Sequence, residues 1–360
     1  ERSSRDKMPA NAPDARRLDA VIRKVMEGSG PDGLAAFAPR PLPGVAPYPS
    51  LIGEAGVVAS ALLAIGSVPG LPLLLIWLWC RARKAETGQH MVRWSQFAAV
   101  AGAVVVLATV PVLRRPRIMQ SRLWRWWLEY MSVRVAYRSG EPLPDGQQYL
   151  FLMMPHGLYP FSGACATISK MVETFFNMRI AVAPAALRLP IIRHLMGWIG
   201  CVSAEQASMR RALANGDNVG LYPGGIAEMV RTVGNVERLV LLKRKGFVRA
   251  ALEQGISIVP VFVFGQSVVF GQLPLPTWVE TLSRWLRASI VLPYGRFGLL
   301  VPRRLPLLYA IGAPIACPRT PSPTPAQVDE VHAGVVAAVQ ELYDFYKGIY
   351  GWGDRPLLLE

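Results

Sequence analysis

The sequence predicts an α/β fold, in which helices flank a mixed sheet, preceded by a transmembrane hairpin. Two observations lead to this prediction. From about Gln147 onward, short apolar runs alternate with helical stretches, which is typical of strands covered by helices. Upstream, Ala55–Cys80 is a run of 26 residues without a charge, and Gln96–Leu113 is a second such run of 18 residues. Runs of this length and composition are typical of membrane helices.

These patterns divide the chain into three regions. Residues 1–50 are charged and rich in Pro and Ala, which predicts a flexible N-terminal tail with a short helix around Leu18–Met26. Residues 51–117 form the membrane hairpin, because helices over 55–80 and 96–113 would be about 39 Å and 27 Å long, and a bilayer core is about 30 Å thick. Two buried helices of a soluble core are the alternative. Residues 118–360 form the α/β domain.

The charge and composition of the chain fit a membrane. It has 39 Lys and Arg residues against 24 Asp and Glu, a net charge of +15, and 52% of its residues are hydrophobic. This balance suits anionic lipid head groups or a polyanionic ligand. Nucleic acid is not expected as a partner, because no zinc-finger spacing, zipper heptad or RNA-binding aromatic motif occurs. The four cysteines form no CxxC pair, and no metal site is expected.

The elements of the α/β domain follow in order. Leu123–Tyr130 carries three tryptophans among arginines, which indicates an interfacial helix, with an ordinary amphipathic core helix as the alternative. Apolar runs predict the strands Tyr149–Met153, Ile180–Ala183, Val219–Leu221, Ile256–Phe264 and Leu308–Ile311. Helices are predicted at Gly163–Phe176, at Glu205–Asn215, within Val236–Gln254, and at Pro325–Tyr350 with Thr324 as N-cap.

His156 is the first candidate for catalysis. It follows the apolar run 151–154, Pro155 restricts the approach of the backbone, and Gly157 permits a sharp turn. The sequence therefore predicts an imidazole at the end of a buried strand. A side chain that titrates near neutral pH can act there as a general base. A hydrogen-bonded core histidine is the alternative.

A second candidate is the loop Pro223-Gly224-Gly225, with Glu228 one helical turn further on. A Pro-Gly-Gly turn after a strand exposes backbone N–H groups, and such a loop can hold an anion or an oxyanion. The alternative is a simple tight turn in which Glu228 is a solvated charge of the first helical turn.

A cluster of cations is the third candidate. Lys243, Arg244, Lys245 and Arg249 open the next predicted helix, and Gly246 leaves room for the close approach of a ligand. The helix dipole disfavours cations at this end unless an anion occupies the site. The cluster therefore predicts a phosphate-bearing ligand, with a solvated helix face as the alternative.

Taken together, these motifs resemble the type-2 diacylglycerol acyltransferase family, which is related to monoacylglycerol and wax-ester acyltransferases. The resemblance runs from about residue 95 to 350. It rests on five motifs in the family's order: Pro155-His156-Gly157, Pro223-Gly224-Gly225-x-x-Glu228, Arg244-Lys-Gly-Phe-Val-Arg-x-Ala251, Val259-Pro-Val-Phe262 with Phe264-Gly265, and Gly312-x-Pro314-Ile315 followed by Pro325 to His332.

The resemblance implies a fold like that of glycerolipid acyltransferases, with residues 118–360 as the acyltransferase domain, and a role for each candidate. His156 is the general base, and Glu228 orients His156 or the acceptor. The N–H groups of Gly224 and Gly225 stabilise the oxyanion. The residues expected to bind acyl-CoA are Arg244, Lys245, Gly246 and Arg249. Acyl-CoA is a co-substrate, and no cofactor is expected.

Two positions depart from the related patterns. The family usually has His-Pro-His-Gly, and here Met154 stands where its first histidine would be. The wider glycerolipid acyltransferases carry His-x4-Asp, whereas Phe161 occupies the fifth position after His156. The carboxylate partner of the histidine is therefore not local in this sequence, and the resemblance implies Glu228 as the candidate.

The function expected from the resemblance is that of a membrane-bound, acyl-CoA-dependent O-acyltransferase that esterifies diacylglycerol to triacylglycerol. Monoacylglycerol or a long-chain alcohol, giving a wax ester, are alternative acceptors. A lipase or esterase is a further alternative, although Ser162 lacks the Gly-x-Ser-x-Gly context of a nucleophile. A non-enzymatic membrane module would carry charges or repeats in its apolar runs, and these runs carry neither.

The expected location is the endoplasmic reticulum membrane, with the catalytic domain facing the cytosol, or a lipid droplet. The N-terminus has no signal-peptide pattern, and no Asn-x-Ser/Thr acceptor occurs in the chain. The expected partners are the bilayer, acyl-CoA and a lipid alcohol. The oligomeric state stays open, with a homo-oligomer among the alternatives.

Overall fold

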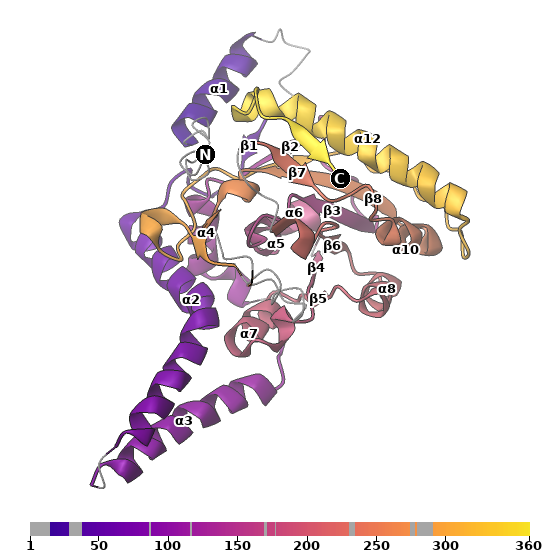
Figure 1. Cartoon of the computed structure of the whole chain (residues 1–360). Helices are drawn as coiled ribbons and strands as arrows, with labels where there is room; N and C mark the ends of the chain where they lie inside the picture. The colour runs from indigo at the N-terminus through magenta and orange to yellow at the C-terminus, as the bar shows by residue number, and fades with distance from the viewer. Residues whose placement is uncertain are drawn as a thin grey trace.

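The computed structural model contains a mixed sheet of eight strands in the order β1-β2-β11-β8-β3-β6-β4-β5, flanked by helices (Figure 1). It describes residues 15–28, 38–85, 88–115, 117–168, 171–176, 178–229, 235–273, 278 and 291–360. The mixed α/β class predicted from the sequence is confirmed at this level.

The sheet strands are β1 (Arg40–Pro41), β2 (Arg134–Tyr137), β3 (Tyr149–Met154), β4 (Arg179–Val182), β5 (Val202–Ser203), β6 (Val219–Leu221), β8 (Ser257–Phe264) and β11 (Leu308–Ile311). Two small two-stranded sheets pair β7 (Glu237–Leu239) with β12 (Leu357–Leu359), and β9 (Gly271–Gln272) with β10 (Pro293–Tyr294).

The α-helices are α1 (Ala15–Gly28), α2 (Leu51–Arg83), α3 (His90–Thr109), α4 (Arg122–Tyr130), α5 (Phe161–Ala166), α6 (Val172–Phe175), α7 (Pro190–Trp198), α8 (Gln206–Ala214), α9 (Ile226–Met229), α10 (Gly246–Gln254) and α12 (Pro325–Tyr350). Short 3-10 turns are η2 (Ile118–Gln120), η4 (Ala186–Arg188), η5 (Gln266–Val268) and η6 (Arg296–Gly298).

The central strands β8, β3, β6 and β4 are parallel to one another, so their carboxyl ends lie at one edge of the sheet. The six side chains of β3 are all buried, because helices cover both faces of the strand. Parallel sheets commonly carry their functional residues just beyond the carboxyl ends of such strands. This edge is where His156 and the Pro223–Gly225 loop leave the sheet.

Helix α12 covers one face of the sheet, as Figure 1 shows. Its ring of Tyr343 lies 4.9 Å from the ring of Phe262 and 5.5 Å from that of Phe264, measured between centroids. Both phenylalanines belong to β8, so α12 packs directly on the central strands. The predicted bounds of this helix and its cap, Thr324, agree with the structure.

The opposite face is covered by α4, α5 and the first half of α2. Val57 and Ala61 of α2 are fully buried in the core that also contains Trp127 and Leu128 of α4. The region predicted as a membrane hairpin, residues 51–117, therefore begins inside the folded body. The predicted interfacial helix Leu123–Tyr130 exists as α4, and its inner end is buried.

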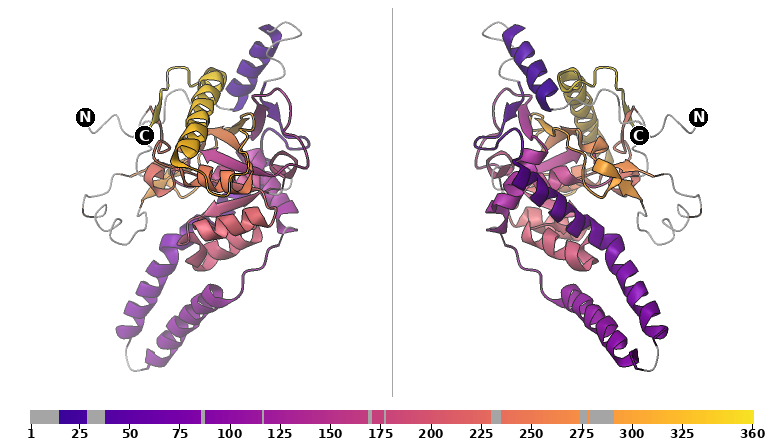
Figure 2. Two further views of the ribbon diagram at one scale, coloured as in Figure 1. Left: turned by 90° about the vertical axis from the view of Figure 1, so that its right-hand side faces the viewer. Right: turned by 90° about the vertical axis from the view of Figure 1, so that its left-hand side faces the viewer.

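The second half of α2 and all of α3 project from the body as a hairpin (Figure 2). Both helices are long and apolar enough to cross a bilayer. Only 17% of the most apolar stretch of α2 is buried, and none of α3. A core helix of a soluble protein would be mostly buried, so the two helices suggest a membrane-associated protein. Helix α2 runs through Pro69 and Pro72 as one helix, and α3 ends at Thr109, before Pro111.

The short helix predicted around Leu18–Met26 exists as α1, and in the described part of residues 1–50 it packs against the body. Leu18 and Ile22 of α1 are buried in the core beneath α12. Asp19 accepts a hydrogen bond from Arg134 of β2 at 2.8 Å. Residues 1–14 and 29–37 lie outside the described residues. Helix α1 is thus part of the packed body rather than a tethered peptide.

The other elements agree with the sequence to different extents. The predicted strands correspond to β3, β4, β6, β8 and β11, and the predicted helices at 205–215 and within 236–254 correspond to α8 and α10. The single helix predicted at Gly163–Phe176 is wrong, because α5 ends at Ala166 and α6 begins at Val172. Helix α7 and strands β2, β5, β7 and β12 had no prediction.

The N-terminal cap of α12 is a capping box, in which Thr324 and Gln327 satisfy each other's backbone N–H groups. Thr324→Ala should lower the stability of the protein by about 1 kcal/mol, because the Gln327 N–H loses its acceptor. Thermal melting in detergent measures the effect, and Thr324→Ser, which keeps the hydroxyl, is the matched control. Equal melting temperatures for the alanine and serine variants would contradict the assignment.

Candidate functional site

Three residues at the carboxyl edge of the sheet come together around one turn. His156 lies two residues beyond β3, Tyr222 directly follows β6, and Gln266 lies two residues beyond β8. These strands are neighbours in the sheet, so the three side chains share one edge. The imidazole of His156 and the ring of Tyr222 meet edge to face, with centroids 5.2 Å apart.

The Glu228 carboxylate connects the loop after β6 to the turn after β3. Its Oε2 accepts a hydrogen bond from the backbone N–H of His156 at 2.8 Å, and its Oε1 accepts one from the backbone N–H of Val240 at 3.0 Å. Glu228 is only 1% exposed. The resemblance implied that Glu228 orients His156 or the acceptor; in the structure its carboxylate contacts the backbone N–H of His156.

Gly224 makes this arrangement sterically feasible. A Cβ atom at position 224 would lie 2.0 Å from Oε1 of Glu228, so the carboxylate folds back onto its own loop only over a glycine. The carbonyl oxygens of Gly224 and Gly225 accept bonds from the N–H groups of Ala227 and Glu228, which begins the short helix α9. The loop therefore serves first to place the carboxylate. A role of its N–H groups in binding an oxyanion stays a prediction.

Burial raises the pKa of Glu228 to about 7, against the opposing effects of its two N–H donors and of the positive charge of Arg244. The carboxyl group thus titrates near neutral pH rather than near 4.5. Ionisable groups with strongly raised pKa values are typical of functional sites.

The ring of His156 is held in one tautomer. Its Nδ1 lies 2.7 Å from the carbonyl oxygen of Gly157. A carbonyl oxygen can only accept a hydrogen bond, so Nδ1 carries the proton and Nε2 carries the lone pair. Burial lowers the pKa of His156 below its usual value of 6.5, although the bond to Gly157 opposes this shift. At neutral pH the ring is therefore neutral, with Nε2 ready to accept a proton.

Gln266 closes the turn from the other side, and sequence reasoning missed it. Its Nε2 donates to the carbonyl oxygens of His156 at 3.2 Å and of Tyr159 at 2.5 Å, and its Oε1 accepts from the N–H of Ser162 at 2.9 Å. Gln266 is 1% exposed. The available signal was a polar residue directly after the Phe264-Gly265 motif, at the same sheet edge as His156.

A buried ion pair contacts Ser267, the residue next to Gln266. Arg355 and Glu237 form a salt bridge at 2.5 Å, and the two side chains are 2% and 1% exposed. Ser267, the neighbour of Gln266, donates to Glu237 at 2.5 Å. Breaking one side of such a pair would leave an uncompensated buried charge. The C-terminal segment around Arg355 is thereby linked to the turn that carries His156.

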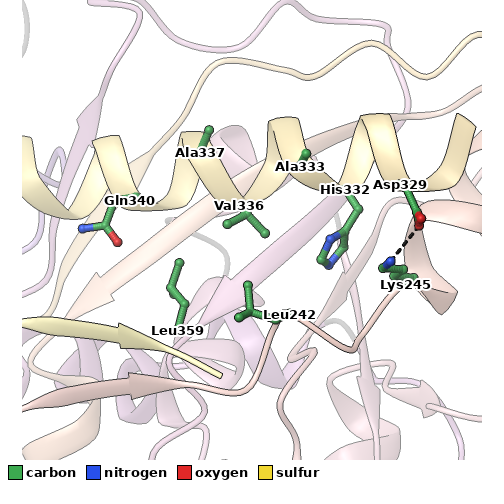
Figure 3. A pocket seen from close by; sticks show the side chains of 9 residues that line it. All are labelled: Leu242, Lys245, Asp329, His332, Ala333, Val336, Ala337, Gln340 and Leu359. Atoms are coloured by element: carbon green, nitrogen blue, oxygen red, sulfur yellow. Dashed lines mark hydrogen bonds and ion pairs between the residues drawn. The ribbon is translucent and has the colours of Figure 1, made fainter. Parts of the chain in front are cut away.

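The cations of the predicted basic cluster differ in their contacts. Lys245 pairs with Asp329 of α12 at 2.7 Å, at one end of a groove lined by Leu242 and Val336 (Figure 3). Arg249 donates to the carbonyl oxygen of Pro323 at 3.2 Å. Both side chains therefore face α12. Gly246 is the first residue of α10, after Lys245 as its N-cap.

Within this cluster, Arg244 has an electrostatic effect on Glu228. It lowers the pKa of Glu228 through its charge, and its side chain is exposed. The loop from Val240 to Lys245 thus runs from the buried carboxylate to the groove on α12. Among the described residues no group of His, Cys, Asp and Glu side chains could hold a metal ion.

Ser162 and the two positions that depart from the related patterns, Phe161 and Met154, have structural roles. The Ser162 side chain is fully buried and its hydroxyl lies 2.7 Å from that of Tyr222, an unsuitable environment for a nucleophile. Phe161 stacks on Trp127 and Phe270, with centroids 5.4 Å and 5.6 Å away. Met154 is buried in the core.

Comparison with known proteins gives one family. The family model described as diacylglycerol acyltransferase matches residues 112–360. The chain is 29% identical over 257 residues to 2-acylglycerol O-acyltransferase 1 of Mus musculus, covering 66% of this chain and 76% of that protein.

Two further relatives have similar values. Diacylglycerol O-acyltransferase 2 of Danio rerio is 28% identical over 257 residues, covering 66% of this chain and 71% of the relative. Acyl-CoA wax alcohol acyltransferase 1 of Homo sapiens is 28% identical over 255 residues, covering 66% and 77%. Among solved structures, the 1-acyl-sn-glycerophosphate acyltransferase PlsC from Thermotoga maritima gives a TM-score of 0.41 at 9% identity, over 82% of this chain and 95% of that chain. That likeness is too weak to bear on the site.

The close fit of Gly224 and Glu228 leads to a prediction about stability. Gly224→Ala should displace the carboxylate and leave two backbone N–H groups without their acceptor, at a cost of about 1–3 kcal/mol for each. Thermal melting in detergent measures the loss. Gly246→Ala is the matched control, because nothing lies within 4 Å of a Cβ atom at that position. An equal effect of the two substitutions would refute the steric argument.

Proposed function

This chain belongs to the diacylglycerol acyltransferase family, and on that premise we propose that it transfers an acyl group from acyl-CoA to the hydroxyl of a lipid alcohol. The observation that carries the proposal is the state of His156. A neutral imidazole with its lone pair on Nε2, at the carboxyl edge of the central strands, is suited to take a hydroxyl proton.

In the proposed reaction, Nε2 of His156 removes the hydroxyl proton while the acceptor oxygen attacks the thioester carbonyl. The new C–O bond forms, and the tetrahedral intermediate collapses with loss of the CoA sulfur. The imidazolium then returns its proton to the thiolate, which leaves as CoA thiol. No acyl-enzyme is needed, because the thioester is already activated.

Glu228 supports this step through the backbone. By binding the N–H of His156, its carboxylate sets the direction in which the histidine leaves β3. The backbone N–H groups of Gly224 and Gly225 are proposed to stabilise the oxyanion of the intermediate, as donors on a loop beside the base. Pro223 has no N–H group and shapes the turn.

The phosphates of acyl-CoA are proposed to bind along the basic loop before α10. Arg244 is exposed beside the Glu228 loop, and the adjacent Lys245 and Arg249 would extend the positive region toward α12 around Gly246. Guanidinium groups suit phosphate, because they offer planar pairs of donors.

Diacylglycerol is the acceptor that we propose first, with triacylglycerol as product. The relatives include enzymes named for 2-acylglycerol and for wax alcohol, so these two acceptor classes stand beside it. The two apolar helices, which are long enough to cross a bilayer, support the proposal of a membrane-bound enzyme that meets such lipids in the bilayer. We further propose the endoplasmic reticulum, with the catalytic body in the cytosol, or the lipid droplet as its location.

The test is an acceptor panel with the full chain purified in detergent. Labelled acyl-CoA is supplied with diacylglycerol, monoacylglycerol or a long-chain alcohol, and the lipid products are separated. Transfer to diacylglycerol above the other two is expected. Release of free fatty acid from acyl-CoA or triacylglycerol, without transfer to any acceptor, would instead identify a hydrolase.

His156→Gln should reduce acyl transfer by about 10²–10⁴-fold, because the general base is lost. Gln keeps a polar side chain of similar reach, so the turn should stay folded. His194→Gln, on α7, is the control for the loss of an imidazole. Near-normal turnover by the purified His156 variant would exclude it as the base.

The pH profile should follow the lowered pKa of His156. Above that pKa Nε2 is free, and below it a proton blocks the base. Activity should therefore persist on acidification through pH 6.5, the usual value for histidine, and decline only at lower pH. Because Glu228 has a pKa of about 7, the profile is measured in the Glu228→Gln variant as well, and an acid limb of kcat/KM at or above pH 6.5 that remains there would contradict the burial of the imidazole.

We expect Arg244 to contribute to the binding of acyl-CoA and not to the binding of the lipid acceptor. Arg244→Gln should raise the KM for acyl-CoA more than the KM for the acceptor, because the ligand of the guanidinium is a CoA phosphate. Arg238→Gln, on the neighbouring strand β7, is the matched control. Equal increases in the two KM values would assign Arg244 to folding of the Glu228 loop.

A further inference from the structure

We propose that the turn η4, which leads into helix α7, and the chain that leaves α3 form a surface for the anionic head groups of a bilayer, beside the sheet edge that carries His156. We call this surface the basic collar and define it by the exposed side chains of Arg114, Arg115, Arg117, Arg122 and Arg188. The proposal rests on the proposed membrane-bound function, and it adds a second contact with lipid to the apolar hairpin.

The chain that leaves α3 and the segment around α7 both carry basic residues and no acidic residues. Residues 110–128 contain five arginines and no acidic residue, and residues 174–204 contain three arginines and no acidic residue. Head-group layers of anionic lipids attract such clusters. The segments are far apart in the sequence, so their shared sign would have no consequence unless the fold joined them.

Hydrogen bonds join the two segments. Arg193 of α7 donates to the carbonyl oxygens of Leu107 and Val110, at 3.0 Å and 2.9 Å, and His194 lies 2.8 Å from the same Leu107 oxygen. These are carbonyl groups at the C-terminal end of α3, which no helical N–H can reach. At a membrane boundary, unpaired carbonyl groups are costly. Helix α7 therefore caps the apolar hairpin at its base.

The packing between the segments is equally close. The N–H of Arg115 donates to the carbonyl oxygen of Trp198 at 3.3 Å. Gly197 faces Val112, and a Cβ atom at that glycine would lie 1.8 Å from the side chain of Val112. The chain that leaves α3 is thus packed against α7 at the end of the hairpin, and this contact holds together the two segments that carry the collar.

The dimensions place this surface at head-group depth. The projecting part of α2, residues 66–83, is about 27 Å long, and α3 is about 30 Å long. These lengths match the hydrocarbon core of a bilayer. No side chain of α7 is fully buried, and Leu189 before it is 37% exposed. The collar lies where the apolar surface of the hairpin ends, so lipid phosphates are its expected neighbours.

The sheet topology links the collar to the site. Strand β4 is parallel to β6, which is parallel to β3, so β4 ends at the edge that carries His156. The chain leaves β4 at this edge and enters η4, which contains Arg188, and then α7. Two strand spacings, about 10 Å, separate β4 from β3. A collar bound to head groups would hold this edge at the level where a lipid hydroxyl emerges from the bilayer.

Hydrogen exchange measured by mass spectrometry tests the proposal without relying on catalysis. The full chain is placed in detergent, in phosphatidylcholine nanodiscs, and in nanodiscs that also contain phosphatidylglycerol. Backbone exchange in 184–200 and 110–122 should be severalfold slower in the anionic nanodiscs than in the other two. The triple variant Arg114→Gln, Arg117→Gln and Arg188→Gln should lose this difference.

Two control variants separate charge from folding. Replacement of the same three arginines by lysine keeps the charge and should keep the protection. Arg40→Gln, Arg211→Gln and Arg319→Gln remove three exposed arginines elsewhere on the body and should leave it unchanged. Acyl transfer in detergent should be unaffected by the collar variants, so a failure of this proposal differs from a failure of the proposed function.

Three outcomes would overturn the proposal. One is equal exchange of these segments in neutral and anionic nanodiscs. Another is the same loss of protection in the variant with distant substitutions. The third is equivalent protection when free CoA is added in detergent, which would show that the collar belongs to the substrate phosphates instead of to lipid.

Discussion

The bond between the Glu228 carboxylate and the backbone N–H of His156 is the constraint on which the rest of the site depends. It joins the ends of β3 and β6, and through Val240 it also positions the loop that carries Arg244. A buried carboxylate that accepts bonds from two separate segments fixes both of them at the cost of its own solvation, and its raised pKa reflects that cost. Gln266 completes the arrangement from β8, so the turn that carries His156 is held by three neighbouring strands.

Sequence reasoning was effective where a single segment carries the signal. The central strands and α12 follow from apolar runs and from the Thr324 cap, which depend on local residues alone. Strand β2 and helix α7 were missed, because their formation depends on partners far along the chain. Gln266 was missed for the same physical reason: its contacts exist only because β8 pairs with β3. The spacing of Lys245 and Arg249 likewise could not show that both face α12.

The apolar hairpin and the proposed catalytic residues lie at one edge of the fold. The strands that carry His156 and Glu228 point their carboxyl ends toward the edge from which the chain enters α7, and α7 caps the end of the apolar hairpin. The first half of α2 packs into the body, so the hairpin is a continuation of the core rather than an appended anchor. This connection is rigid, because it consists of helix packing and hydrogen bonds to backbone carbonyl groups. For an enzyme that modifies lipids, this connection would fix the depth of the site relative to the bilayer.

The central claim is that His156 is neutral, with its proton on Nδ1 and its lone pair on Nε2. Nitrogen-15 NMR of protein labelled at histidine measures this state directly, and the signal is assigned by its loss in the His156→Gln variant. At neutral pH the account predicts one protonated nitrogen, Nδ1, and an Nε2 resonance in the range of an unprotonated imidazole nitrogen. An imidazolium, or a ring protonated on Nε2, would contradict the account.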